Sequence, residues 1–153
     1  MLYLCREDVG EYCKKVRKLA LELLEAISES LGVVGRRLEK DYTVKALGNN
    51  GLHLAINYYP PSPQPELTYG LPSHADHNPI TILLQDDMLP SLQVISNESV
   101  LHRAMVNCEK EKMSIPTFYG PSPDAMIGPA AQLVDNDPLL YSSFTYSEYY
   151  QKF

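Results

Sequence analysis

Residues 69–85 read Tyr-Gly-Leu-Pro-Ser-His-Ala-Asp-His-Asn-Pro-Ile-Thr-Ile-Leu-Leu-Gln. Alternate side chains of an extended chain share a face, so His74 and Asp76 can direct an imidazole and a carboxylate toward one point. A second imidazole would complete a 2-His-1-carboxylate triad, an arrangement that binds Fe(II) and leaves coordination positions open. His102 is the best candidate for this third ligand, and His53 and His77 fit less well.

The spacing alone leaves a second interpretation open. A His-x-Asp pair arises often by chance, and an exposed loop pair that binds no metal is the ordinary alternative. Residues outside this stretch are needed to choose between the two.

Composition and charge restrict the class of protein. The 153 residues are 44% hydrophobic and 21% charged, which is typical of a soluble chain with one packed domain. A formal net charge of −6 disfavours nucleic acid and anionic membrane as partners. No apolar run approaches the roughly 20 residues of a membrane span, and residues 1–8 lack the order of a signal peptide. We therefore expect a cytoplasmic protein.

The cysteines do not indicate a disulfide framework or a zinc site. Cys5, Cys13 and Cys108 are odd in number and show no Cys-x-x-Cys spacing. We expect reduced thiols.

Residues 8–31 are predicted to form a long amphipathic helix, because apolar residues recur there at intervals of three and four. Asp8 with Glu11 resembles a capping box, and Gly32 is placed to end the helix. We expect the apolar face to pack on the chain's own sheet, with a partner-binding helix as the alternative. A loop at 33–37 and a second short helix at about 38–47 are predicted to follow.

Most of the remaining segments are predicted to be strands. Residues 52–59 alternate in polarity, and His53, Ala55, Asn57 and Tyr59 share the more polar face. Further strand-like segments are residues 80–84, 92–95, 99–107, 113–119 and 125–127. Near the end, Thr145 and Glu148 form a capping box that opens a tyrosine-rich helix.

Several motifs together resemble the plant 2-oxoglutarate/Fe(II)-dependent dioxygenases. They are Asn-Tyr-Tyr-Pro-Pro at 57–61, Tyr-Gly-Leu-Pro at 69–72, Leu-His-Arg at 101–103 and Lys-Met-Ser at 112–114. The longer stretches at 57–70 and 114–119 are most similar to the branch of downy-mildew-resistance salicylate hydroxylases and flavonoid oxygenases. The resemblance covers almost the whole chain.

The resemblance implies a mainly β, α+β fold: an incomplete double-stranded β-helix, or jelly roll, backed by the long N-terminal helix. Residues 1–51 would be a helical support region and residues 52–153 the dioxygenase domain. It further implies that Fe(II), held by His74, Asp76 and His102, acts with 2-oxoglutarate and O₂ on a small aromatic or phenolic plant metabolite. Ascorbate is a further candidate cofactor, and we expect a monomer.

The family also implies which residues hold 2-oxoglutarate. Asn57 and Tyr59 would lie beside it, and an Arg-x-Ser motif would bind its distal carboxylate. Here Lys112 stands in the arginine position, and Ser114 is intact. Lysine offers a point charge where arginine offers a planar two-pronged donor. Arg103 is not expected to substitute, because it neighbours His102 on a strand and points to the opposite face.

The chain is shorter than the resembled fold requires. Residues 77–101, 25 in number, separate the His-x-Asp pair from His102. Four strands of about 5 to 6 residues with turns of about 3 need upwards of roughly 30. We interpret the chain as a fragment, an altered splice product or a damaged gene copy, and expect impaired turnover. The alternative function is a non-catalytic remnant that acts, if at all, as a binding protein.

Overall fold

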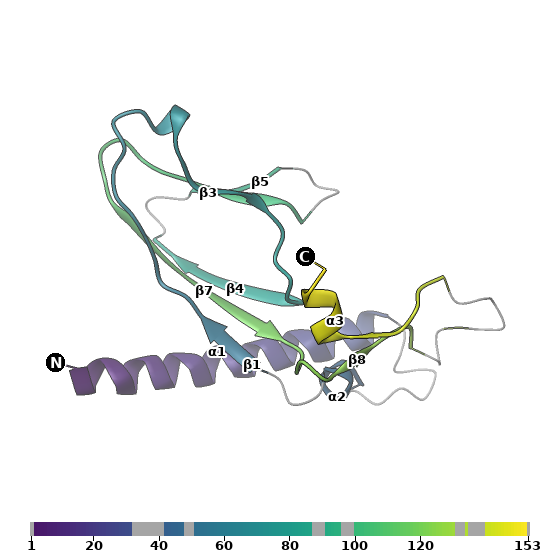
Figure 1. Ribbon diagram of the computed structural model, residues 1–153. Helices are drawn as coiled ribbons and strands as arrows, with labels where there is room; N and C mark the ends of the chain where they lie inside the picture. The colour runs from purple at the N-terminus through teal and green to yellow at the C-terminus, as the bar shows by residue number, and fades with distance from the viewer. Residues whose placement is uncertain are drawn as a thin grey trace. The chain divides into compact units, whose positions relative to one another are not determined.

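A computed structural model describes residues 2–31, 42–47, 51–86, 91–95, 100–130, 134 and 140–152 (Figure 1). The chain divides into two compact units, one formed by Met1–Leu52 with Tyr119–Phe153 and the other by His53–Phe118. These units are defined by packing. The predicted functional division between residues 51 and 52 stays a prediction.

The first unit contains the long helix α1, Leu2–Ser30. Its buried stripe consists of Val16, Ala20, Leu24 and Ser28, spaced four residues apart so that they share one face. A neighbouring stripe of Leu19, Leu23 and Ile27 is more than 40% exposed. The predicted packing of the helix on the sheet stays a prediction.

The predicted start of this helix at Asp8 is wrong. The helix already includes residues from Leu2 onward, so Asp8 lies within it. Glu11 instead pairs with Lys15 one turn later, with 2.7 Å between Oε1 and Nζ. This exposed pair lowers the pKa of Glu11 through the hydrogen bond and charge of Lys15. Gly32 and the loop at 33–37 lie outside the described residues.

Helix α2, Tyr42–Ala46, is joined to α1 by hydroxyl groups. Thr43 Oγ1 donates to the Leu24 carbonyl at 2.9 Å, and the buried Ser28 Oγ donates to the same carbonyl at 2.9 Å. The two hydroxyls lie 2.8 Å apart. The first four residues of the predicted helix at 38–47 lie outside the described part of the chain.

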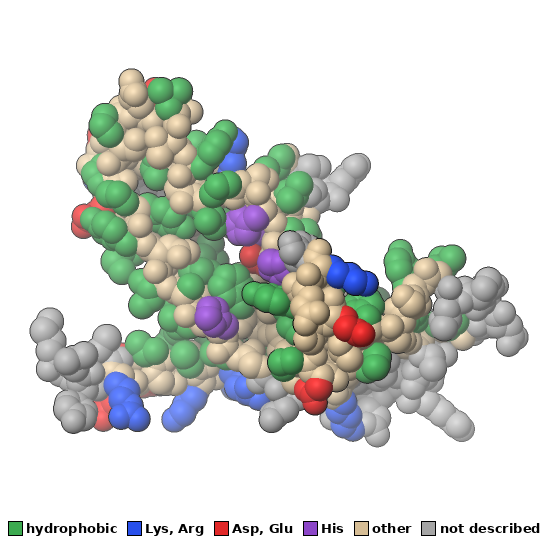
Figure 2. Space-filling view, viewed as in Figure 1, with side chains coloured by type: hydrophobic (Ala, Val, Ile, Leu, Met, Phe, Trp, Pro, Cys, Tyr) green, Lys and Arg blue, Asp and Glu red, His purple; other side chains and the backbone are tan. Residues whose placement is uncertain are grey.

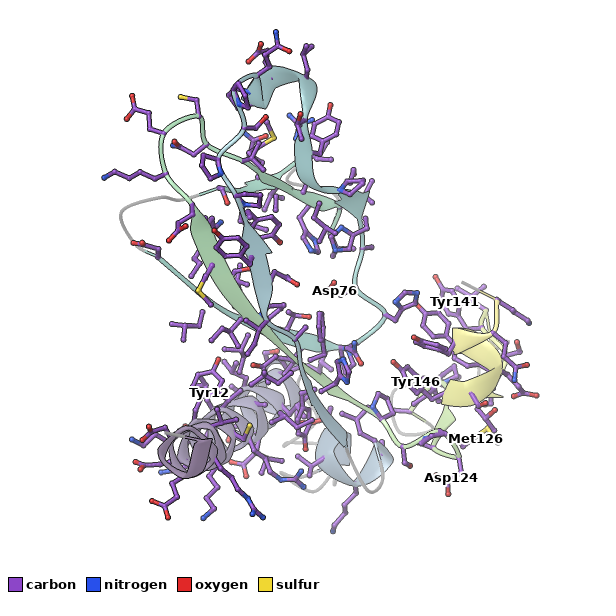
Figure 3. The ribbon with its side chains drawn as sticks, turned by 60° about the vertical axis from the view of Figure 1, so that its left-hand side comes forward. Tyr12, Asp76, Asp124, Met126, Tyr141 and Tyr146 are labelled. Atoms are coloured by element: carbon purple, nitrogen blue, oxygen red, sulfur yellow. The ribbon has the colours of Figure 1, made fainter. Side chains whose placement is uncertain are left out.

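The C-terminal part of this unit pairs β8, Met126–Ile127, with β9, Phe144–Thr145. Helix α3, Tyr146–Tyr150, follows β9 directly, and Tyr146 is labelled in Figure 3. Its predicted capping box is confirmed: Thr145 Oγ1 accepts from the Glu148 N–H, and the Glu148 carboxylate accepts from the Thr145 N–H. None of the described helices has the length and apolar character that a bilayer crossing requires.

The second unit is built from two antiparallel sheets. In sheet A, β7 (Lys112–Gly120) pairs with β1 (Gly51–Leu54), β2 (Asn57–Tyr59) and β4 (Ile80–Gln85). In sheet B, β6 (His102–Met105) lies between β3 (Tyr69–His74) and β5 (Leu92–Val94). A short 3₁₀ helix, Pro65–Leu67, precedes β3. The prediction of a mainly β fold is confirmed.

The predicted strand at 52–59 is interrupted. Strand β1 ends at Leu54 and β2 begins at Asn57, although the Ala55 N–H still donates to the Pro116 carbonyl at 3.1 Å. The segment therefore follows β7 on both sides of the break.

Little apolar surface is buried in the second unit. Among its described residues, the buried hydrophobic side chains are Tyr59 and Ala104, and the buried polar ones are Lys112, Ser114 and Thr117. The polar residues all belong to β7. The interior of this unit is therefore built around polar groups.

Candidate metal centre and anion-binding cavity

A cavity of about 570 Å³ lies between the two sheets of the second unit. Sheet A contributes Asn57 and Tyr59 from β2 and Lys112 and Ser114 from β7. Sheet B contributes His74 and His102. Figure 2 shows histidine side chains at the surface beside an acidic side chain. All the sequence-predicted site residues thus line one cavity.

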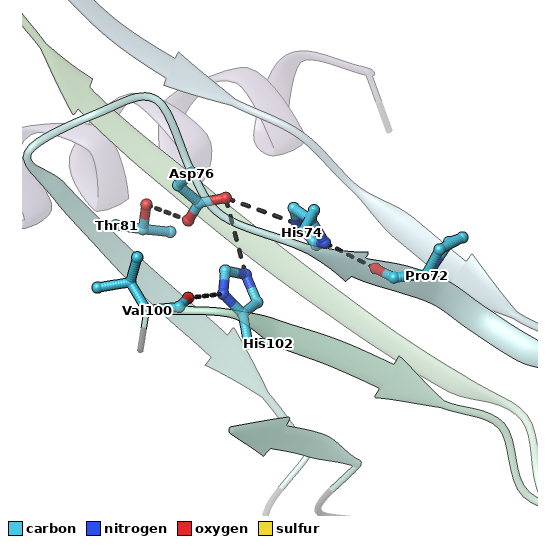
Figure 4. A network of polar contacts seen from close by, with 6 residues as sticks. All are labelled: Pro72, His74, Asp76, Thr81, Val100 and His102. Carbon is cyan, nitrogen blue, oxygen red and sulfur yellow. Dashed lines mark hydrogen bonds and ion pairs between the residues drawn. The ribbon is translucent and has the colours of Figure 1, made fainter. Parts of the chain in front are cut away.

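Three potential metal ligands converge in this cavity (Figure 4). His74 is the last residue of β3, and His102, the first residue of β6, lies directly opposite it in the strand pairing. Asp76 follows on the segment that leads to β4, where Figure 3 labels it. Its Oδ1 lies 3.6 Å from His74 Nε2 and 3.7 Å from His102 Nε2. The three ligand atoms lie within 4.8 Å of one another.

The other polar atoms of these side chains are already bound. His74 Nδ1 lies 2.8 Å from the Pro72 carbonyl, and His102 Nδ1 lies 2.9 Å from the Val100 carbonyl. Because a carbonyl only accepts, each Nδ1 must carry the proton, and each neutral ring then has a lone pair on Nε2. Both rings therefore have the tautomer in which Nε2 can bind a metal.

A hydrogen bond to its second oxygen also orients the Asp76 carboxylate. Thr81 Oγ1, on β4, donates to Asp76 Oδ2 at 2.6 Å, which leaves Oδ1 directed at the two imidazoles. The carboxylate is 16% exposed, and the side chains of His102 and His74 are 22% and 35% exposed. The two Nε2 atoms and the carboxylate oxygen thus face one another. This donor set fits a divalent cation.

An irregularity in β3 brings His74 onto the cavity side. Pairing with β6 shifts between Leu71 and His74, because three residues of β3 span two residues of β6. In a regular strand, Leu71 and His74 would face opposite sides, yet both line the cavity. A β-bulge at Pro72 and Ser73 explains the reorientation, as bulges do near other functional sites.

Lys112 forms the cationic end of the cavity. Its side chain is only 5% exposed, and its Nζ donates to Gln85 Oε1 at 3.1 Å and to Ser91 Oγ. The ammonium also lies 5.9 Å from the centre of the Tyr59 ring. Burial lowers the pKa of Lys112, and the carboxylate of Asp86 offsets part of this shift.

Two cross-strand pairs of β2 and β7, with one further pair between them, assemble the rest of this end. Asn57 lies opposite Ser114, and Tyr59 lies opposite Lys112. Their side chains line the cavity from sheet A. Arg103 does not line it: its Nε donates to Gln93 Oε1 at 2.9 Å, and its guanidinium lies 5.2 Å from the Tyr69 ring centre. The expected orientation of Arg103 away from the site is confirmed.

Sequence reasoning missed three residues that orient the site: Thr81, Gln85 and Ser91. Alternation along β4 could have identified Thr81 and Gln85. Together with Leu83 they are alternate residues of this strand, and all three line the cavity. Ser91 carried no such signal, because its position depends on pairing in space. The Met105 N–H donates to the Ser91 carbonyl at 2.9 Å and holds it at the edge of sheet B.

Gly70 was also missed, and it fixes the position of the Tyr59 ring. A Cβ at Gly70 would lie 2.7 Å from Tyr59 Cδ1 and 3.3 Å from the Ala104 carbonyl oxygen. We expect Gly70→Ala to displace the ring, to lower the free energy of unfolding by about 1–3 kcal/mol and to weaken anion binding beside Lys112. Calorimetric titration and thermal unfolding would measure both. Gly51→Ala is the matched control, because no atom lies within 4 Å of the added Cβ; equal losses in both variants would contradict the prediction.

Comparison with known proteins agrees with the geometry. Residues 50–97 match the family model described as the 2OG-Fe(II) oxygenase superfamily. Protein DMR6-LIKE OXYGENASE 2 of Arabidopsis thaliana is 49% identical over 97% of this chain and 50% of its own length. Flavanone 3-dioxygenase 2 of Oryza sativa subsp. japonica is 42% identical over 97% of this chain and 51% of its own length.

A solved structure shares the fold. The crystal structure of JOX2 in complex with 2OG, Fe, and JA is 32% identical, with a TM-score of 0.84 over 96% of this chain and 52% of that chain. Over nearly its whole length the chain is therefore similar in sequence to these two plant oxygenases. It spans about half the length of the curated relatives that it matches.

Proposed function

We propose that this relative of the 2OG-Fe(II) oxygenases carries an iron and 2-oxoglutarate site, with His74, Asp76 and His102 as the metal ligands. One observation carries the proposal: Asp76 Oδ1 lies within 3.7 Å of both Nε2 atoms, while the remaining polar atoms of all three side chains are hydrogen-bonded elsewhere. Such preorientation of ligands by outer hydrogen bonds is typical of metal sites.

The distances suit a metal of this class after a small adjustment. Ligand atoms about 2.0–2.2 Å from one ion, on one face of an octahedron, lie roughly 3 Å from each other. The observed separations of 3.6 and 3.7 Å exceed this by a few tenths of an ångström. Closing this difference requires a small movement of the partly exposed His74 and His102 side chains when the metal binds.

The cationic end of the cavity supports 2-oxoglutarate as the co-substrate. Lys112 would bind the distal carboxylate, and Asn57, Tyr59 and Ser114 would orient the molecule by hydrogen bonds. Bound Fe(II) supplies the oxidative chemistry with O₂ and 2-oxoglutarate, yielding succinate, CO₂ and an oxidised substrate. The residues of this chain hold the co-substrate, fix its orientation and screen the cavity from water.

A small aromatic or phenolic substrate is proposed from the relatives and the cavity lining. The name of the rice relative includes flavanone as its substrate. The apolar side chains that line the cavity include Leu71, Leu83, Leu92, Val94 and Phe118. Such surface suits a planar ring. The cytoplasmic location, the monomeric state and the absence of nucleic-acid or membrane partners stay predictions from composition.

The test is anaerobic titration of the purified chain with Fe(II) and then 2-oxoglutarate, followed by a succinate assay in air. Saturable binding of both, with iron-dependent succinate release, is the expected sign of an oxygenase site. Failure to bind either ligand would contradict the proposal.

A non-catalytic binding protein is the second candidate function. It is favoured by the small number of buried hydrophobic side chains among the described residues of the second unit. Binding of Fe(II) and 2-oxoglutarate without any succinate release would support this candidate over the enzyme.

Lys112→Arg is expected to tighten 2-oxoglutarate binding by about tenfold, since one added charge-assisted hydrogen bond contributes about 1.5–3 kcal/mol. Ser114→Ala is expected to weaken it. Isothermal titration with Mn(II) in place of Fe(II), without O₂, measures both variants. If the arginine variant binds no better, the carboxylate must be held by other residues.

The affinity for 2-oxoglutarate is also expected to depend on pH. Because burial lowers the pKa of Lys112, the ammonium loses its proton at a lower pH than an exposed lysine would. Binding should therefore be strongest below this pKa and should weaken as the pH rises through it. Lys112→Arg should remove the alkaline loss, since arginine stays protonated. The same alkaline loss in both proteins would exclude Lys112 as its origin.

A further inference from the structure

The ammonium of Lys112 is held from both sheets at once. Gln85, the last residue of β4 in sheet A, accepts one hydrogen bond from Nζ at 3.1 Å. Ser91, which the Met105 N–H anchors to the edge of sheet B, accepts another. The Tyr59 ring lies 5.9 Å from the same nitrogen.

These contacts limit what Lys112 can offer to a ligand. A lysine ammonium has three N–H donors and no acceptor. Two of the donors are directed at Gln85 Oε1 and Ser91 Oγ. Only one donor is then left for an anion in the cavity, although a carboxylate can accept from several donors at once.

We infer that Gln85 and Ser91 are positioning residues that restrict Lys112 to a single hydrogen bond with the distal carboxylate of a 2-oxo diacid, and so set how strongly the cavity selects diacids over 2-oxo monoacids. This inference rests on the proposed function and deepens it. Gln85 and Ser91 act through Lys112, and their effect on the ligand is opposite in sign to that of a residue that binds the ligand directly.

The readout is a selectivity ratio. Calorimetry on the Mn(II)-loaded chain without O₂ would compare 2-oxoglutarate with 2-oxobutanoate, which keeps the metal-binding end but lacks the distal carboxylate. One charge-assisted hydrogen bond corresponds to roughly ten- to a hundredfold preference for the diacid. Lys112→Met is expected to reduce this preference to near unity.

Ser91→Ala separates the inference from a direct binding role. Removing the hydroxyl acceptor frees a second donor of Lys112, so the diacid preference is expected to rise by about threefold or more. A fall in the preference would mean that Ser91 itself donates to the carboxylate, and an unchanged value would mean that it does not restrain Lys112; either result overturns the inference. Ser73→Ala, at an exposed serine of β3, is the matched control. Circular dichroism would verify that each variant is folded.

An experiment without metal tests the inference even if the chain does not bind iron. Glutarate has two carboxylates and no keto group, so its binding beside Lys112 does not depend on the histidines. Acetylation of Lys112 by acetic anhydride, read by peptide mass spectrometry against the exposed Lys110, would be measured with and without glutarate. If glutarate protects Lys112 from acetylation more strongly in Ser91→Ala than in the wild type, the inference is supported even if no iron is bound. Absence of protection in both proteins would overturn it.

Discussion

Replacing His102 with alanine is expected to lower the affinity for Fe(II) or Mn(II) by at least about a hundredfold. Changes to outer hydrogen-bond partners of metal ligands already lower affinity by about 10–100-fold, and loss of a ligand removes a bond to the metal itself. His74→Ala and Asp76→Ala should behave alike, because their ligand atoms converge on the same point. Anaerobic calorimetry measures all three.

His53→Ala is the control for this set. His53 lies 6.1 Å from the ring of Phe118 and outside the group of three, so its removal should leave metal affinity unchanged. Thr81→Val should reduce the affinity by about tenfold, because it releases Asp76 Oδ2 from its donor. Equal affinity in the wild type and in His74→Ala would exclude the assignment.

The second unit is expected to be marginally stable, with thermal unfolding below the ~45 °C that begins the usual range of mesophile domains. Its buried hydrophobic side chains, among the described residues, are Tyr59 and Ala104. Many large apolar side chains stay exposed, including Tyr58 and Met113 on sheet A and Ile56 between β1 and β2. Little turnover to succinate should follow.

Calorimetric unfolding with a succinate assay tests this expectation. A ligand present at a hundred times its dissociation constant stabilises the folded state by about 2.7 kcal/mol, so Mn(II) with 2-oxoglutarate should raise the transition temperature. Met113→Thr should lessen self-association without altering the cavity, because Met113 is exposed and does not line it. A cooperative transition above ~45 °C with iron-dependent succinate release would refute the prediction.

The alternation of polar and apolar side chains in residues 52–59 was sufficient to predict which of them face the cavity. The polar face assigned to residues 52–59 supplies Ala55, Asn57 and Tyr59 to the cavity, although the strand breaks before Asn57. Family resemblance added Lys112 and Ser114, which the structure brings to the same cavity. The roles of these residues as ligands stay predictions.

Other features depend on contacts that a sequence pattern does not contain. The bulge before His74 changes the face on which it lies, so strict alternation would have separated it from Leu71. The partners of Lys112 come from strands far apart along the chain. The prediction that the helix starts at Asp8 was wrong because the residues before Asp8 are also helical. An aspartate can occupy the interior of a helix as well as its N-terminus.

The direct pairing of His74 with His102 also bears on how the chain folds. A slip of one residue between β3 and β6 would turn one of the two imidazoles away from the other, since neighbouring side chains on a strand point to opposite faces. A metal ion that needs both rings would then stabilise one strand alignment over its competitors. Iron present during refolding would therefore favour the correct pairing of β3 with β6, in addition to binding the folded protein.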